Sequence, residues 1–439
     1  MTSGQLVSFF YVTIFLLVPM VSHVLFGQTD WSIYYYTHPA PWVLALLTGL
    51  WLLTASPMLR LKVSHVRRPN QKLHKLKAFL SKYTLTLAIL ITLTVFFLYS
   101  PSLLSFRYTG SGVSTGGWKL MLIIMLRSIT SIYLMWLLVI FRSQNLNIRL
   151  SDRISVWLLA VVLLYTVNGT VSFLSAILFL LFAASPKSFT NLVFTKTTRS
   201  LPSVKAIWNF FFLPFLLIAL IFSSLIIGEG IKSNKFSLDI TVVIFSIKWL
   251  AIRLVDGVSS HYYALVQFFD PQTYRILEQY DHPFGYYLKT IEYRTNQLLG
   301  FDPVRPNVQS LSRLNFLVNS FKISAREGTS AGPFASFAYI FPLPLALFAA
   351  LIYLRWVISL IDRFFNLPGF KLTIFGGIFV LQQLLFLYES PLDFLIIIDN
   401  LPFLVIILWL FAQMRTDTVL RQALKNSSTT QPQTELVRS

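Results

Sequence analysis

The chain contains long apolar runs that approach or exceed the length one helix needs to cross a lipid bilayer. Residues 7–26 and 83–104 contain no Lys, Arg, Asp or Glu. About 20 helical residues cross the roughly 30 Å hydrocarbon core, and a helix satisfies its own backbone hydrogen bonds there. The runs therefore predict an all-α, polytopic membrane helix bundle of about 10 transmembrane helices, with one large periplasmic loop domain carrying interfacial helices.

The composition supports a membrane protein and excludes cysteine chemistry. Hydrophobic residues make up 55% of the chain and charged residues 12%, which is too apolar for an ordinary soluble domain. There is no cysteine, so disulfides, thiolate metal sites and cysteine nucleophiles are excluded. The first apolar run lacks a basic leader and a small-residue cleavage site, and is interpreted as a retained span.

The positive charge is concentrated in short loops, which fixes the predicted orientation. Residues 60–82 contain eight Lys/Arg and no acid, and residues 187–205 contain four and none. Loops of this kind mark the cytoplasmic side of a multi-span protein, so the net charge of +19 is no indication of nucleic-acid binding. Both termini are predicted to be cytoplasmic.

Four parts follow from this pattern. Residues 1–227 form an N-terminal bundle of about seven spans, 228–333 a large periplasmic loop, 334–413 the last three spans and 414–439 a cytoplasmic tail. The loop contains eleven Lys/Arg and nine of the seventeen Asp/Glu. Its apolar stretch 240–255 carries two cations and is placed in the outer interface, amphipathic or re-entrant. If it spanned instead, the rest of the loop would be cytoplasmic.

The loop contains two candidate groups for proton transfer. On a helix over 250–262, Arg253, Asp256 and Ser260 share one face, where a guanidinium and a carboxylate can hold an anion and accept a proton. The alternative is an intrahelical ion pair. His261 is a second candidate general base, and the alternative is a histidine that only makes local hydrogen bonds.

Three further arginines in the loop are candidate phosphate ligands. Arg305 precedes Pro306, which biases it to an extended backbone, and a guanidinium binds phosphate oxygens in a bidentate manner. Arg326 precedes a small-residue stretch, with an interfacial anchor as the alternative. Arg294 lies two residues after Glu292 and is alternatively a surface charge. No Gly-rich phosphate loop, His-x-Glu or Asp-x-Asp motif occurs, so no cofactor and no metal is expected.

Four short segments resemble a known family when they are taken in order. They are NGTVSFL (168–174), PVRP (303–306), TSAGP (329–333) and YESPLDF (388–394). Together with the span pattern they resemble the Wzy-type O-antigen, or repeat-unit, polysaccharide polymerases, which are similar to integral-membrane glycosyltransferases of the C type. Val171 departs from the family pattern, which often has an arginine just after the Gly-Thr of the first segment.

The resemblance implies an enzyme of the bacterial inner membrane. It would transfer a growing undecaprenyl-diphosphate-linked glycan onto the next lipid-linked repeat unit at the periplasmic face, with a chain-length regulator as a further partner. Arg253 and Arg305 would bind the diphosphate, Arg294 and Arg326 would support them, and Asp256 or His261 would be the base. A lipid-linked oligosaccharide flippase, an O-antigen ligase and a structural scaffold are the alternatives.

Overall fold

The structure is a computed structural model of the full chain. It describes thirteen stretches, and every structural statement below concerns these: 1–26, 41–56, 83–98, 117–143, 148–167, 170–196, 260–279, 285–298, 301, 311–320, 330–367, 369–389 and 391–392. Most of the described residues are helical, as the sequence predicts.

The helices and two short strands follow one another along the chain. The N-terminal half contains α1 (Ser3–Val12), a π-helical segment (Thr13–Leu17), α2 (Val18–Phe26), α3 (Pro41–Ala55), α5 (Thr84–Leu98), α7 (Gly117–Ser143), α8 (Leu150–Tyr165), α9 (Thr170–Ala184), α10 (Pro186–Val193) and β1 (Phe194–Lys196). A helical segment over 260–267 follows, then α13 (Pro271–Glu278), α14 (Gly285–Leu298), α15 (Leu311–Ser320), α16 (Gly332–Ala338), α17 (Leu343–Phe365), β2 (Phe370–Leu372), α18 (Ile374–Gln383) and α19 (Phe386–Glu389).

Three described helices are long and apolar enough to cross a bilayer: Ser3–Leu25, Met125–Ser143 and Leu343–Phe365. Four shorter apolar helices accompany them, at Val43–Thr54, Thr84–Leu98, Ser172–Ala184 and Ile374–Gln383. Predicted spans at 206–227 and just before residue 414 lie outside the described residues. The structure therefore supports an all-α membrane protein, and the count of ten spans stays a prediction.

The first span contains a π-helical segment that its sequence explains. Pro19 has no N–H to donate. In a regular α-helix its ring would also clash with the carbonyl of Phe15, four residues earlier. The helix widens just before it, so that the Val18 N–H bonds to the Thr13 carbonyl, five residues back. Such segments are rare and often occur at functional sites, because they re-aim side chains on one face.

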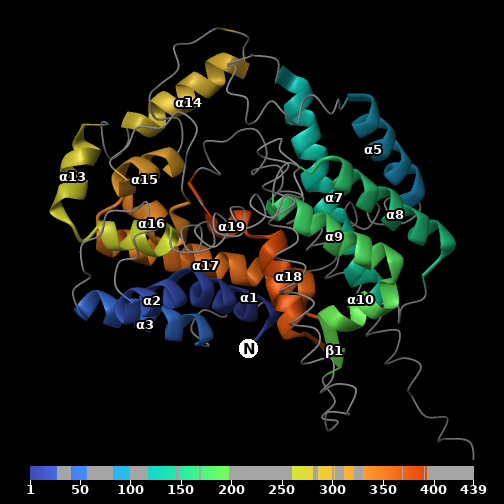
Figure 1. The fold of residues 1–439 in the computed structure, drawn as a ribbon, viewed down its shortest axis with the longest axis horizontal. Coiled ribbons are helices and arrows are strands. Elements are labelled where there is room, and N and C mark those ends of the chain that lie inside the picture. The colour runs from blue at the N-terminus through green and yellow to red at the C-terminus, as the bar shows by residue number, and fades with distance from the viewer. Residues whose placement is uncertain are drawn as a thin grey trace, which may run out of the picture.

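The described helices form two groups joined by α18 (Figure 1). In one group α1 packs on α3, α17 and α18, and α16 packs on α17. In the other, α8 packs on α5, α7 and α9. Helix α18 also contacts α9 and α10, and thereby links the groups. The blue N-terminal helices lie beside the orange α17, so segments more than 300 residues apart in the sequence build one core (Figure 1).

The start of the chain joins the ends of two spans by hydrogen bonds. The Gly4 N–H donates to Asp362 Oδ1 at 2.7 Å, in the last turns of α17. The Gln5 side chain donates to the Ser56 carbonyl at 2.8 Å, just after α3. The two helix ends that lead into predicted basic loops therefore lie beside the N-terminus.

The two strands and the end of α7 lie near this end as well. β1 and β2 pair in antiparallel fashion with Thr195 opposite Lys371, and β2 also contacts α1. Arg142 Nη1 donates to Asn191 Oδ1 at 2.8 Å, and its guanidinium carbon lies 4.0 Å from the centre of the Phe370 ring, a cation–π contact. Segments that the charge pattern assigns to one side of the membrane are thus neighbours.

The eighth span begins later than its apolar pattern predicts. The sequence predicts one helix over 334–357, but α16 ends at Ala338 and a new helix begins at Leu343. Pro342 is the N-cap of α17, and Pro344 occupies its first turn. Proline removes a backbone donor and disfavours helix at the preceding residue, so the pair divides the run.

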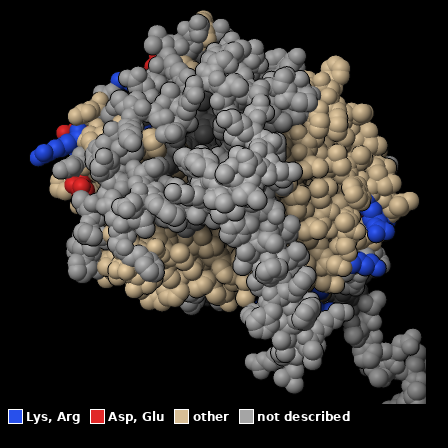
Figure 2. Space-filling view, in the orientation of Figure 1, with Lys and Arg blue, Asp and Glu red and all other residues tan. Residues whose placement is uncertain are grey.

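On the face shown in Figure 2, the described residues are largely uncharged. Broad tan areas cover the two sides of the view, and blue or red atoms appear at their edges. Large apolar side chains are exposed along α5 and α17: Leu90, Leu93, Phe97, Leu345, Phe348 and Ile352. Exposed apolar surface on this scale is a liability in water and fits contact with lipid.

Candidate functional site

His261 is the one predicted site residue whose side chain the structure describes, and it is enclosed in the core. Every residue from 260 to 268 is buried, and His261 is 2% exposed. Its Nδ1 lies 2.9 Å from the Tyr11 hydroxyl oxygen, and its ring stacks on Phe15 with centroids 4.8 Å apart. The 260–268 part of the predicted periplasmic loop therefore packs inside the helices.

Tyr11 lies within the first candidate span, Ser3–Leu25, away from both of its ends. At 1.5 Å per residue it lies about 12 Å along the span that begins at Ser3. Phe15, whose ring stacks on that of His261, lies in the π-helical segment of the same span. The widened turn thus coincides with the place where the histidine docks.

Gly332, from the small-residue segment predicted at 329–333, provides the third side of this contact. Gly332 begins α16 with a φ of 71°, a left-handed conformation that favours glycine. A Cβ at this position would lie 2.6 Å from the Tyr11 hydroxyl oxygen and 3.0 Å from His261 Cγ. Only glycine lets α16 approach both rings, so the small residue is explained by close packing at this point.

Tyr388, from the segment 388–394, closes the cluster. Its ring stacks on that of Tyr11 with centroids 4.5 Å apart. Its hydroxyl shares a hydrogen bond of 2.8 Å with Ser8 Oγ, one turn before Tyr11. We call Ser8, Tyr11, His261, Gly332 and Tyr388 the Tyr11 cluster. It unites a candidate base with two of the four segments that carry the family resemblance.

Burial sets the protonation state of the histidine. It lowers the pKa of His261 to about 3, because the imidazolium would lose its hydration. The ring is therefore neutral near pH 7, with Nδ1 paired to the Tyr11 hydroxyl. A general base works best when its pKa is close to the working pH, so this environment favours a hydrogen-bonding role over proton abstraction.

A second polar contact lies further along the first span. His23 Nδ1 is 3.3 Å from the Tyr263 hydroxyl, and the His23 ring meets the Tyr262 ring edge-on with centroids 6.0 Å apart. His23 is 5% exposed. Sequence reasoning singled out neither His23 nor Tyr11, although polar side chains inside a span are rare and often functional.

The structure does not describe the side chains of the other predicted site residues. Arg294 lies in α14, and its side chain is not described. Arg253, Asp256, Arg305 and Arg326 lie outside the described residues. Among the residues that the structure describes, no three His, Asp or Glu side chains are grouped so that they would hold a metal ion.

Removing the Tyr11 hydroxyl is expected to destabilise the protein. Tyr11→Phe leaves the buried His261 Nδ1 without its partner, at a cost of about 1–3 kcal/mol. The measurement is the thermal unfolding midpoint of the purified protein in detergent. Tyr274→Phe is the control, because Tyr274 is 38% exposed and water can replace its hydroxyl contacts. Equal midpoints for Tyr11→Phe and wild type would contradict the role given to this hydrogen bond.

Comparison with known proteins gives no relative: no protein-family model, curated protein or solved structure matches the chain.

Proposed function

We propose that the chain is an integral-membrane glycosyltransferase that polymerises an O-antigen-type polysaccharide. It transfers the growing undecaprenyl-diphosphate-linked glycan onto the next lipid-linked repeat unit, at the periplasmic face of the bacterial inner membrane. The helical, apolar architecture is compatible with this location. A lipid-linked oligosaccharide is its substrate, and a chain-length regulator is a further partner.

The convergence on Tyr11 is the observation that carries the proposal. His261, the segment 329–333 and the segment 388–394 were selected from separate parts of the sequence. Gly332 packs on the rings of Tyr11 and His261, and Tyr388 stacks on Tyr11. Segments that belong to one active site are expected to meet in this way, and their meeting at Tyr11 supports the proposal.

Two of the remaining candidates are attached to this cluster by short lengths of chain. Asp256 is five residues before His261, and Arg326 is six residues before Gly332. An extended chain covers at most about 3.6 Å per residue, so both are tethered within about 22 Å of the cluster. The segments that carry Asp256 and Arg326 are therefore both tied to the same cluster, which supports their belonging to one site.

The reaction needs positive charge and a base. Arg253 and Arg305 bind the diphosphate, with Arg294 and Arg326 in support, and stabilise the charge that develops on it as the bond between the anomeric carbon of the growing glycan and the diphosphate breaks. The acceptor oxygen forms the new glycosidic bond to that carbon, and undecaprenyl diphosphate leaves. The acceptor hydroxyl loses its proton to Asp256 or His261. Of these two, the low pKa of His261 favours Asp256 as the base, with His261 holding the surrounding helices in place.

The proposed orientation draws on contacts at one end of the bundle. The N-terminus, the end of α3 and the end of α17 are joined by the Gly4–Asp362 and Gln5–Ser56 hydrogen bonds. The basic segments next to these ends would lie in the cytoplasm, with both termini. Tyr11 lies about 12 Å along the first span from that end and about 21 Å from its other end at Leu25, so the cluster lies in the half of this span that is nearer the cytoplasm.

Replacing Arg305 tests the proposal. In a bacterial strain that lacks this protein, wild type is expected to restore a ladder of long glycan chains. Arg305→Ala is expected to give single repeat units while the protein remains in the membrane, because one diphosphate contact is lost. The measurements are glycan length on gels and protein amount in isolated membranes. Arg275→Ala is the control, since this arginine of α13 is exposed and outside the proposed site.

The outcomes also separate the alternatives. Wild-type chain lengths with Arg305→Ala would remove this residue from the site. In the strain without the protein, single repeats on the final acceptor indicate a missing polymerase. Complete absence of glycan there would indicate a flippase, and long glycan retained on the carrier lipid would indicate a ligase. Either of the last two results would overturn the polymerase assignment.

A further inference from the structure

A small polar cavity lies where three helices of the second group end, away from the Tyr11 cluster. Its lining residues come from the start of α5, the last turns of α7 and the start of α8: Thr84, Trp136, Leu137, Ile140, Phe141, Arg149 and Asp152. The candidate span Met125–Ser143 ends at this level. The cavity is therefore at the depth where lipid headgroups meet a membrane protein.

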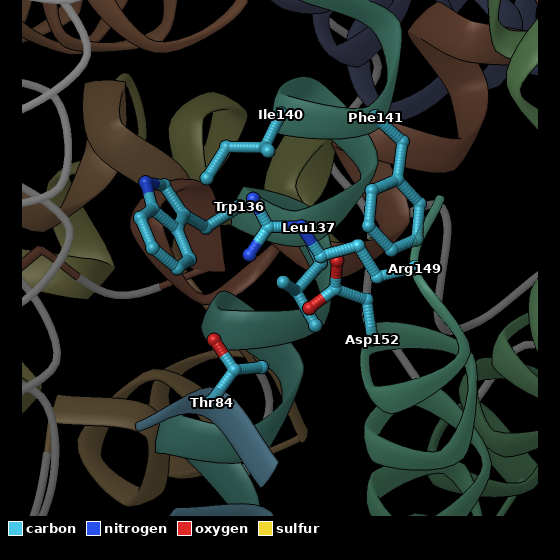
Figure 3. Close-up of a pocket in the computed structure, with 7 residues that line it drawn as sticks. All are labelled: Thr84, Trp136, Leu137, Ile140, Phe141, Arg149 and Asp152. Carbon is cyan, nitrogen blue, oxygen red and sulfur yellow. The ribbon is translucent and has the colours of Figure 1, made fainter. Parts of the chain in front are cut away.

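The polar groups of this cavity face one another. Figure 3 shows the guanidinium of Arg149, the carboxylate of Asp152 and the hydroxyl of Thr84 directed toward a common space beside the Trp136 ring. Arg149 is exposed and Asp152 is partly buried. The cavity is thus lined by a cation on an exposed residue and an anion on a partly buried one, a pattern that complements a ligand carrying both charges.

The contacts of Asp152 with Arg149 offset only part of the cost of burying the Asp152 carboxylate. Burial raises the pKa of Asp152, and the Arg149 charge and a backbone hydrogen bond oppose this effect without cancelling it. A second cation beside Asp152 would stabilise its ionised form. The indole face of Trp136 is an additional favourable surface for such a cation.

The volume of the cavity limits which ligand groups can enter it. The cavity measures about 60 Å³, well above the minimum that a single water needs. This space suits an ammonium group and its attached carbon, whereas a complete phospholipid headgroup would extend out past Arg149. A primary ammonium has three N–H donors for the carboxylate and hydroxyl oxygens, and a trimethylammonium group has none.

We propose that this cavity binds the headgroup of a phospholipid with a primary ammonium, of the phosphatidylethanolamine class. The ammonium occupies the space between Asp152, Thr84 and Trp136, and the phosphate lies at Arg149. The acyl chains follow the exposed apolar side chains of α8, which include Leu150, Ile154 and Trp157. This site is independent of the proposed glycan chemistry.

Two other headgroups fit less well. A phosphatidylglycerol headgroup offers its phosphate to Arg149 but has no cation for Asp152. A phosphatidylcholine headgroup has a cation that cannot donate hydrogen bonds and is wider. We therefore expect the order ethanolamine, then monomethyl and dimethyl ethanolamine, then choline. The series changes the number of N–H donors while the phosphate stays the same.

Lipid binding to the purified full chain tests the site. The probes are phosphatidylethanolamine, its mono- and dimethylated forms, phosphatidylcholine and phosphatidylglycerol with identical acyl chains, measured by native mass spectrometry. We expect phosphatidylethanolamine to bind about fivefold more tightly than phosphatidylcholine, as one charge-assisted contact would provide. Asp152→Asn is expected to abolish that preference. Equal affinity of wild type for these two lipids would overturn the proposal.

Controls keep the test decisive. Arg153→Gln, next to Asp152 in sequence but outside the cavity lining, is expected to keep the fivefold preference. If Asp152→Asn does not yield folded protein, Arg149→Gln tests the phosphate contact, and unchanged binding of phosphatidylethanolamine to it would overturn the site. Soluble phosphoethanolamine is expected to compete weakly because it lacks acyl chains. Competition equal to that of the lipid would overturn the assignment to a membrane lipid.

Discussion

Gly332→Ala is expected to give a protein with a strongly lowered unfolding midpoint and little of the proposed polymer. An L-residue in the left-handed conformation costs roughly 1–2 kcal/mol. The new Cβ would also press on Tyr11 and His261, and overpacking of this kind costs about 1–3 kcal/mol. Neither ring has room to move, because Tyr11 is stacked on Tyr388 and His261 on Phe15.

Gly369→Ala separates these two contributions. Gly369 has a φ of 74°, close to that of Gly332, but a Cβ there would meet no atom within 4 Å. It therefore carries the backbone cost without the clash. Thermal unfolding in detergent and glycan length are measured for both variants. If Gly369→Ala loses as much stability as Gly332→Ala, the close approach of α16 to the Tyr11 cluster is not what requires glycine.

Gly4→Ala is expected to disturb the packing of the first span on α17. A Cβ at Gly4 would lie 2.2 Å from the Ile358 carbonyl oxygen, so the two backbones must separate. That movement also strains the Gly4–Asp362 hydrogen bond. We expect a loss of about 3 kcal/mol, at the upper end of overpacking costs, because the obstructing atom belongs to a helix backbone rather than to a mobile side chain.

A glycine in open space is the matched control for Gly4. Gly49 lies inside α3 with nothing within 4 Å of its would-be Cβ, and Gly49→Ala is expected to raise stability by about 0.5–1 kcal/mol. Gly376 offers a second test, since a Cβ there would lie 2.2 Å from the Val193 carbonyl oxygen. Unchanged unfolding midpoints for Gly4→Ala and Gly376→Ala would contradict the tight helix contacts described for α1 and α18.

Local sequence patterns were sufficient to predict that the chain is mostly helical and where its first span lies. The apolar run 7–26 predicted the first span, and the structure has Ser3–Leu25. Apolar length alone did not reveal the break before α17, which depends on Pro342 and Pro344. The five predicted site residues other than His261 stay predictions, since the structure does not describe their side chains.

The sequence predicted only part of the candidate site. His261, Gly332 and Tyr388 all fall in segments that chemistry or resemblance had singled out. Tyr11 did not, because one tyrosine in an apolar run carries no indication that it contacts a histidine 250 positions later. The intramembrane polar residues Ser8, Tyr11 and His23 were the signal that would have found it.

The sequence by itself determined that the chain is helical and apolar enough for a membrane, because the length and polarity of a run are local properties set by the hydrocarbon core. The tertiary structure decided which distant residues meet. The close approach of Gly332 to the Tyr11–His261 pair depends on how whole helices pack, and so does the meeting of Asp152 with Thr84 and Trp136 in one cavity. Packing is a collective property of many side chains, and no single stretch of sequence contains it.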